Sequence, residues 1–238
     1  IKIDKLFTIN NFHKKLLIHN NYSSEIMLYK NSISNIEITN SKRSQLYYNI
    51  AFIGRITLDK NIQPLIDGVN LYNISRDRKI TLYIIGDGNI NLNNLNDNII
   101  LLGKLNYNEI LQKFYNIDYV ISASITEGKP FSILEAQFSG IPCIHSNING
   151  INEIIFHNIN GFLFELKNYN KIKFDMNFNN LQSARNNDNV SNVLDVLIKA
   201  YNISIEQWNI MSNNCIMYSK NKYDHSSCSR SNMYNFEK

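Results

Sequence analysis

The sequence predicts an α/β protein with a Rossmann-like, doubly wound parallel sheet. Between residues 47 and 166, short runs rich in β-branched and aromatic residues alternate with helical patterns. That alternation is typical of βα units built around a parallel sheet. The chain has 238 residues, 44% of them hydrophobic, which is enough for one good-sized core and part of a second domain.

The elements follow one another in a regular order along the chain. Strands are expected at residues 48–54, 80–86, 98–102, 118–122, 141–145 and 161–164, and helices at 62–74, 108–116, 132–138 and 152–156. A polar, Asn-rich stretch at 171–189 predicts a surface loop, and helices at 190–200 and 205–220 follow it. Residues before 47 contain strand-like and helical pieces but no complete unit, and 226–238 form a polar tail.

Composition excludes several classes of protein. A net charge of +4 with 18% charged residues is too mild for a dedicated nucleic-acid binder. Three distant cysteines without a CxxC pair support neither a disulfide framework nor a zinc site, and a reducing cytosol is expected. The five histidines form no metal-binding pair, and the dinucleotide and Walker fingerprints are absent from the sequence.

The segment at residues 122–136 carries most of the chemistry. A buried strand ends there, a Gly/Pro loop follows, and a helix begins, with Glu127 in the loop and Glu135 on the first helical turn. Backbone N–H groups and the helix dipole make such a helix start a natural anion site. A diphosphate would rest there with one carboxylate toward a sugar and the other toward ribose hydroxyls.

Both carboxylates also have a purely structural interpretation. Ser132 and Glu135 match a capping box, in which the carboxylate would only bond the backbone at Ser132. Glu127, taken alone, would be a solvated loop residue. The sequence leaves these alternatives open.

A second loop, after the strand at 48–54, carries Arg55 and Lys60. Arg grips phosphate oxygens through two N–H groups, and Lys adds a point charge. The alternative is a surface salt bridge with Asp59. Because both loops follow strands of one sheet, they are expected to open on the same edge and to form a pocket for a nucleoside-diphosphate sugar.

These motifs occur in the order found in the C-terminal domain of glycosyltransferase family 4, enzymes with the two-Rossmann GT-B fold. The chain resembles that domain from about residue 26 to about 225, and 27–33 resemble the segment joining the two domains. The matching positions are 54–55, 60, 85–88, 100–103, 118–120, 127–135, 139–142, 149–155 and 160–164. The resemblance divides the chain into an N-terminal remnant with the interdomain segment (1–36), a nucleotide-sugar-binding domain (37–225), and a tail or crossing helix (226–238).

The resemblance also implies roles for individual residues. Arg55 and Lys60 would bind the donor diphosphate and steady the leaving group, and Glu127 would contact the donor sugar near its reacting end. Glu135 would bind the ribose. The sugar and the distal phosphate would be held by the stretch that contains Gly128, Lys129, Phe131 and Ser132. Transfer would retain the anomeric configuration, without a metal or a cofactor beyond the UDP-sugar or GDP-sugar donor.

Two departures from the family pattern stand out. Where many members have Gly-Phe-Gly after the first Glu, this chain has Gly-Lys-Pro-Phe at 128–131, which we interpret as a changed sugar preference. Asn61 and Asn149 replace common glycines, and Asn tolerates the left-handed conformation that glycine is often used for.

The leading hypothesis is a transferase in surface polysaccharide or lipopolysaccharide assembly. Its acceptor would be a glycan or a lipid-linked glycan, which predicts a cytoplasmic location with contact at the inner face of the membrane. Activity would need an N-terminal half or a partner subunit. The alternatives are a nucleotide-sugar-binding module without activity, a GT-B epimerase and a degenerate pseudoenzyme; retention of both cations and both carboxylates argues against the last.

Overall fold

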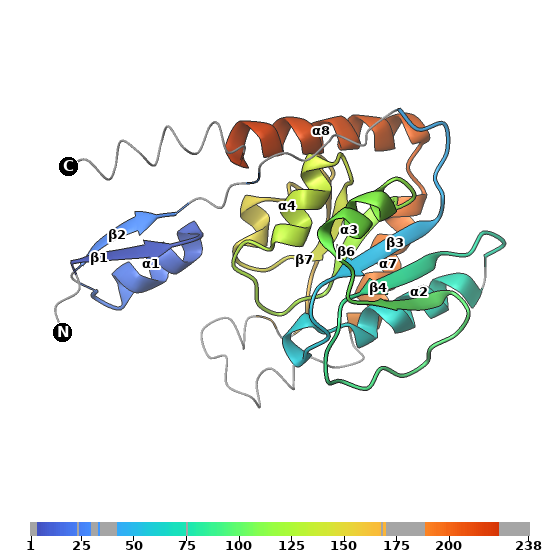
Figure 1. Cartoon of the computed structure of the whole chain (residues 1–238), viewed down its shortest axis with the longest axis horizontal. Coiled ribbons are helices and arrows are strands. Elements are labelled where there is room, and N and C mark those ends of the chain that lie inside the picture. Colours follow the sequence, from blue (N-terminus) through green and yellow to red (C-terminus); the bar gives the residue numbers. More distant parts are fainter. Residues whose placement is uncertain are drawn as a thin grey trace.

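The computed structural model describes residues 4–22, 24–29, 33, 42–74, 76–167, 169 and 189–223. All six expected strands pair in parallel in one sheet, which confirms the predicted fold class (Figure 1). In spatial order they are β5 (Ile99–Gly103), β4 (Thr81–Ile85), β3 (Asn49–Ile53), β6 (Tyr119–Ser122), β7 (Cys143–Ser146) and β8 (Gly161–Phe164). The predicted tail at 226–238 and the predicted loop at 171–189, except its last residue, lie outside the described residues.

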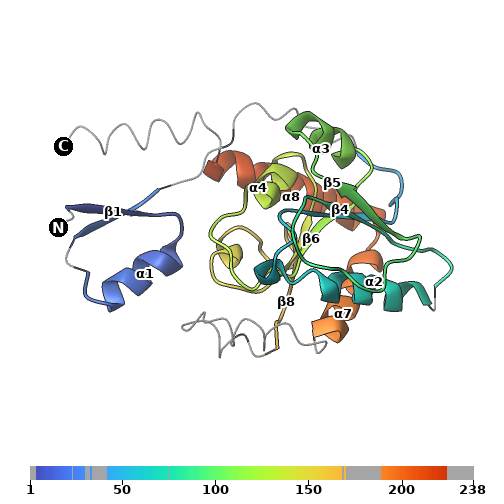
Figure 2. The same cartoon turned by 60° about the horizontal axis from the view of Figure 1, so that its bottom comes forward.

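Helices cover both faces of this sheet (Figures 1 and 2). On one face, α2 (Gln63–Ile74) packs against α7 (Asn189–Tyr201), while α3 (Tyr107–Phe114) and α4 (Phe131–Phe138) lie on the other. The long α8 (Ile205–Tyr223) packs across α4. The helix expected at 152–156 is wrong, because the chain makes only the short 3-10 turn η2 (Ile151–Glu153) there.

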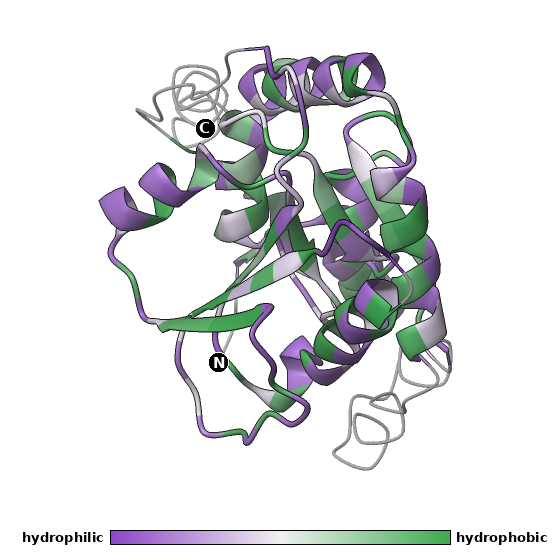
Figure 3. Cartoon of the chain, turned by 90° about the vertical axis from the view of Figure 1, so that its right-hand side faces the viewer, coloured by the Kyte–Doolittle hydropathy of each residue, from purple (hydrophilic) through white to green (hydrophobic). Residues whose placement is uncertain are grey.

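The burial pattern explains why the strands were readable from the sequence. All four residues of β6 and of β7 are buried, as expected for parallel strands with helices on both faces. In Figure 3 hydrophobic residues dominate the strands, whereas the helices carry both hydrophobic and hydrophilic residues. Among the described residues, no helix is both long enough and apolar enough to cross a membrane.

A buried ion pair fastens the segment before β3 to the start of β6. Arg43 Nη1 lies 2.7 Å from Asp118 Oδ1, and the two side chains are 9% and 0% exposed. The same carboxylate accepts hydrogen bonds from the backbone N–H groups of Tyr47 and Asn49. The Arg43 guanidinium also lies 4.4 Å from the ring of Trp208 in α8. Burial lowers the pKa of Arg43 and raises the pKa of Asp118, because both charges have lost their water.

The N-terminal residues form a complete βαβ unit, so the expectation that no complete unit precedes residue 47 is wrong. Strands β1 (Lys5–Thr8) and β2 (Glu25–Leu28) pair in parallel, with α1 (Asn11–His19) between them. The expected interdomain segment at 27–33 therefore begins inside β2. The sequence pattern does not predict this unit, because its strands are only four residues long and α1 buries no residue.

Side chains at the start of α1 attach this unit to the large sheet. Asn10 caps α1 by accepting from the His13 N–H at 2.8 Å, and its Nδ2 donates to the Gly128 carbonyl at 3.2 Å. The backbone N–H and the side chain of Asn11 both donate to Glu153, each at 2.9 Å. The N-terminal unit thus contacts the loop after β6 and the turn after β7.

Candidate functional site

The strand order creates a crevice between β3 and β6. From β3 the chain winds outward through β4 to β5, and from β6 it winds in the opposite direction through β7 to β8. Ligands bind at such a switch point, outside the carboxyl ends of the strands. A cavity of about 570 Å³ lies there, lined by Phe52, Ile53, Gly54, Arg55, Lys60, Val120, Ile121, Ser122, Glu127, Pro130, Phe131, Ser132, Ile133 and His145.

A close ion pair joins the two predicted loops across this cavity. Lys60 Nζ lies 2.6 Å from Glu127 Oε1 and 3.8 Å from Asp59 Oδ2. The Lys60 and Glu127 side chains are only 15% and 11% exposed, so the interpretation of Glu127 as a solvated loop residue is wrong. The Ile125 N–H donates to the Asp59 carbonyl at 2.8 Å and holds the loops in register.

Arg55 lies at the mouth of the same cavity. Its side chain is exposed, and it forms no ion pair with any residue that the structure describes. The salt bridge expected as an alternative therefore involves Lys60 and Asp59 and leaves Arg55 out. A guanidinium in this position is available to an anionic ligand.

The first turn of α4 forms part of the wall of the same cavity. Pro130 is the N-cap residue, in an extended conformation, and no side chain caps the helix. Ser132 is the second residue of the helix, so the capping-box interpretation of Ser132 and Glu135 is wrong. The uncapped helix start, with Phe131 and Ser132 on the cavity wall, keeps its N–H groups available for an anion.

Glu135 stands apart from the cavity lining, and its carboxylate makes no hydrogen bond or ion pair with another described residue. Burial raises its pKa to about 7. The pKa of Tyr107, at the start of α3, is raised by the burial of Tyr107 itself and, to a smaller extent, by the Glu135 carboxylate. The structure does not test the predicted contact between Glu135 and the ribose, which remains a prediction.

Two of the predicted binding residues contact other parts of the chain, Gly128 the N-terminal unit and Lys129 the end of α8. A Cβ on Gly128 would lie 2.2 Å from Ile9 Cδ1, so the Ile9 side chain would have to move to admit one. Lys129 is 6% exposed, and its Nζ lies 5.5 Å from the Tyr223 ring centroid at the end of α8. The structure therefore gathers Arg55, Lys60, Glu127, Phe131 and Ser132 around the cavity and leaves Gly128, Lys129 and Glu135 outside its lining.

His145, at the third position of β7, also lines the cavity and was not predicted from the sequence. It is fully buried, its Nδ1 lies 3.0 Å from the Ser146 carbonyl oxygen, and its Nε2 has no hydrogen-bond partner among the described residues. Burial lowers its pKa to about 4, so the ring is neutral at neutral pH. The sequence signalled only a strand here, although a histidine inside an apolar strand is itself unusual.

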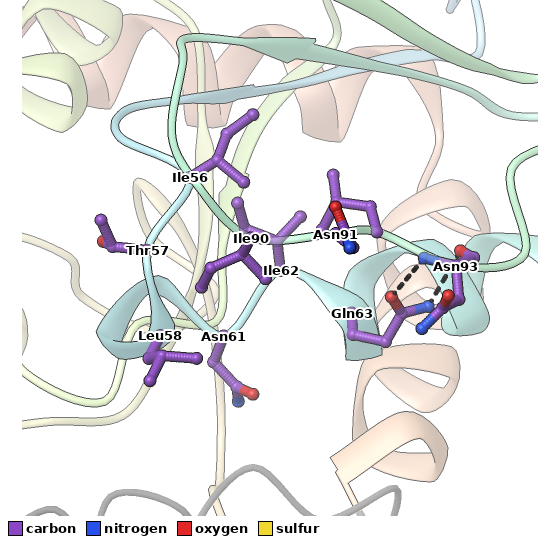
Figure 4. Close-up of a pocket in the computed structure, with 10 residues that line it drawn as sticks. Ile56, Thr57, Leu58, Asn61, Ile62, Gln63, Ile90, Asn91 and Asn93 are labelled. Carbon is purple, nitrogen blue, oxygen red and sulfur yellow. Dashed lines mark hydrogen bonds between the residues drawn. The ribbon is translucent and has the colours of Figure 1, made fainter.

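A second cavity, of about 280 Å³, lies beside the Lys60 loop (Figure 4). The Gln63 side chain closes one end by pairing twice with Asn93. Asn61 adopts the left-handed conformation with φ +49°, as expected, and its buried amide has no partner among the described residues. Asn149 is not left-handed; the following Gly150 takes φ +92° instead.

The sequence model of the family described as "Glycosyl transferases group 1" matches residues 47–174. The chain is 44% identical over 73 residues to the Escherichia coli UDP-Gal:alpha-D-GlcNAc-diphosphoundecaprenol alpha-1,3-galactosyltransferase, a match that covers 31% of this chain and 18% of that enzyme. It is 33% identical over 138 residues to the E. coli O-antigen biosynthesis glycosyltransferase WbnH, covering 54% and 37%. The chain thus spans well under half the length of these relatives.

Solved glycosyltransferase structures share the fold over nearly the whole chain. The GtfA/B complex matches 99% of this chain and 45% of its own with a TM-score of 0.76 at 18% identity. Anabaena HepE in complex with UDP and glucose matches 98% and 62% with a TM-score of 0.71 at 12% identity. Together, the crevice with its paired loops and the family match over more than half of the chain show that the protein belongs to the group 1 glycosyl transferases.

Proposed function

We propose that this chain is the donor-binding part of a retaining glycosyltransferase that moves a hexose from a nucleoside-diphosphate sugar to a glycan acceptor. One observation carries the proposal. At the switch point of the sheet, Lys60 is paired with Glu127 at 2.6 Å, beside an uncapped helix start and an Arg55 that pairs with no residue the structure describes. Two cations and a row of N–H groups fit a diphosphate, and the carboxylate fits sugar hydroxyls.

The arrangement suits the energetic demand of the reaction. As the acceptor oxygen bonds to the anomeric carbon, the bond from that carbon to the phosphate oxygen breaks and negative charge grows on the diphosphate. Arg55, Lys60 and the α4 N-terminus would stabilise that charge, which is the largest contribution in such transfers. In the front-side mechanism the departing phosphate takes the proton of the acceptor hydroxyl, so the residues present need supply no separate base. Metal independence remains a prediction of this mechanism.

The relatives suggest where the product is used. One acts on a diphosphoundecaprenol-linked sugar and another is named for O-antigen biosynthesis. We extend this to surface polysaccharide assembly on a lipid-linked acceptor at the cytoplasmic face of the membrane. The βαβ unit at 4–29 would meet the part of the enzyme, in the same chain or in a partner subunit, that holds the acceptor.

Calorimetric titration with UDP, GDP and ADP tests the donor site. We expect saturable binding of one nucleotide, weakened by Glu135→Ala because the ribose loses its carboxylate partner. Glu206→Ala, which removes an exposed carboxylate from the start of α8, is the matched control and should bind like the unchanged protein.

A transfer assay separates the enzyme from a simple binding module. A form completed by its acceptor-binding half should release nucleoside diphosphate in the presence of a glycan acceptor, and Lys60→Met should abolish that release. Binding without transfer in the completed form would favour the module, and no binding of any nucleotide would refute the donor site.

A further inference from the structure

Among the cavity-lining side chains, His145 is a polar group for which the proposed transfer chemistry gives no role. The imidazole is 0% exposed, yet it forms part of the cavity wall at the carboxyl end of β7. A buried polar atom without a partner is expensive, about 1–3 kcal/mol. A ligand group that satisfies Nε2 would recover that free energy.

The hydrogen bonds of the other ring nitrogen fix which form of the ring is present. Nδ1 lies 3.0 Å from the Ser146 carbonyl oxygen, which can only accept, so Nδ1 carries the proton and donates. The Ser146 hydroxyl gives its own proton to the Ser124 carbonyl oxygen at 2.5 Å and so can only accept from the ring. The neutral ring therefore leaves Nε2 as a hydrogen-bond acceptor, in a side chain that forms part of the cavity wall.

Because Nε2 is a hydrogen-bond acceptor, it can bind only those groups of the donor that carry a proton to donate. Phosphate oxygens are acceptors, so a neutral Nε2 repels them, whereas sugar hydroxyls can donate to it. Glu127 and Lys60 line the same cavity as His145, so the ring shares the cavity wall with the carboxylate that would face the sugar. The two acceptors, the carboxylate and Nε2, fit neighbouring hydroxyls of a pyranose ring.

We infer that His145 is a specificity-determining residue, whose Nε2 accepts a hydrogen bond from one hydroxyl of the donor sugar beside Glu127. This inference rests on the proposed function. It adds a residue that selects among donor sugars, because a sugar lacking that hydroxyl leaves Nε2 buried and unpaired. Sites that hydrogen-bond a substrate hydroxyl reject the analogue without it more strongly than purely apolar pockets do.

Two variants of similar size test the inference by calorimetry. His145→Leu removes the acceptor and keeps the volume, whereas His145→Gln keeps an acceptor; His157→Leu, at an imidazole that bonds the Leu163 N–H away from the cavity, is the control. The probes are UDP-glucose, UDP-galactose, UDP-N-acetylglucosamine and GDP-mannose, with free UDP and GDP for comparison. His145→Leu should raise the Kd of the preferred nucleotide sugar about 3- to 10-fold and leave the Kd of the free nucleotide unchanged, while His145→Gln should restore most of the affinity.

Deoxy analogues of the preferred sugar give an independent readout in the unchanged protein. Removing one particular hydroxyl should weaken binding by about the same 3- to 10-fold, and that loss should vanish in His145→Leu. The deoxy series on the unchanged protein and on His145→Gln keeps the inference testable if the Leu variant does not fold.

An unchanged nucleotide-sugar Kd in His145→Leu, or an equal loss of affinity for the free nucleotide, would overturn the inference. If the unchanged protein bound nucleotides but none of the sugars more tightly than the matching nucleotide, the inference would fail while the nucleotide site stood; if it bound no probe, the proposed function would fail first.

Discussion

Removing the Glu127 charge should strengthen the binding of a free diphosphate while it disables sugar transfer. Glu127 Oε1 lies 2.6 Å from Lys60 Nζ, and both side chains are mostly buried. The carboxylate thus already neutralises the Lys60 charge that a diphosphate would need. Glu127→Gln keeps the shape of the side chain and releases Lys60.

The size of the effect follows from the geometry of the pair. Deleting one partner of a buried ion pair costs about 3–5 kcal/mol, because the other charge is left uncompensated. Asp59 at 3.8 Å compensates part of the Lys60 charge, and the pair retains some exposure, so about half of that free energy, roughly 1.5–2.5 kcal/mol, is available to an incoming anion. Since each 1.4 kcal/mol is a factor of ten, UDP or pyrophosphate should bind Glu127→Gln roughly 10- to 70-fold more tightly.

Calorimetry on the unchanged protein and four variants would measure this effect. Lys60→Met should weaken pyrophosphate binding, the double variant should bind no more tightly than Lys60→Met, and Glu206→Gln should match the unchanged protein. Equal or weaker pyrophosphate binding by Glu127→Gln would refute the reasoning, since it would mean that the carboxylate orients Lys60 for phosphate and does not compete with it.

Three further predictions concern stability. Asp118→Asn should lower the free energy of unfolding by about 3–5 kcal/mol in urea denaturation, because it strands the buried Arg43; a loss below about 1 kcal/mol would contradict the role of the pair. Asn61→Ala should be about 1–2 kcal/mol less stable than Asn61→Gly, because φ is +49° there; equal melting curves would argue against that conformation. The pKa of Glu135 is raised to about 7, so its burial favours the protonated form and that contribution is lost as pH rises from about 4.5 through 7. Glu135→Gln should therefore gain stability relative to the unchanged protein between pH 5 and pH 8, and a constant difference would show that the carboxylate is solvated.

The sheet was predictable because its strands carry their own signal. Each is a short, largely apolar run bounded by Gly or polar residues, and every residue of β6 and β7 is buried, as expected for parallel strands with helices on both faces. The N-terminal strands lack that signal, since β1 and β2 are half exposed. Pairing between two such strands depends on contacts that local patterning does not encode.

The sequence predicts the site residues that lie in recognisable loop motifs. It does not predict those that reach the site only because distant strands lie side by side in the fold. Lys60 and Glu127 stood out as charged residues after strands. His145 did not, because its role depends on β7 lying next to β6, where the Ser146 hydroxyl reaches the Ser124 carbonyl across 22 residues of sequence. The capping-box interpretation failed because Pro130, with its fixed φ, is the N-cap of α4, two residues before the Ser132 that the pattern implied.

The contact between Asn10, at the start of α1, and the loop after β6 couples the position of the N-terminal βαβ unit to that of the loop. Asn10 holds the carbonyl of Gly128, the residue directly after Glu127, and a Cβ at Gly150 would strike both that carbonyl and the Asn10 amide, at 2.6 and 2.9 Å. These contacts leave no room between the Asn10 side chain and the backbones of Gly128 and Gly150. A displacement of α1 would therefore move the peptide that follows Glu127.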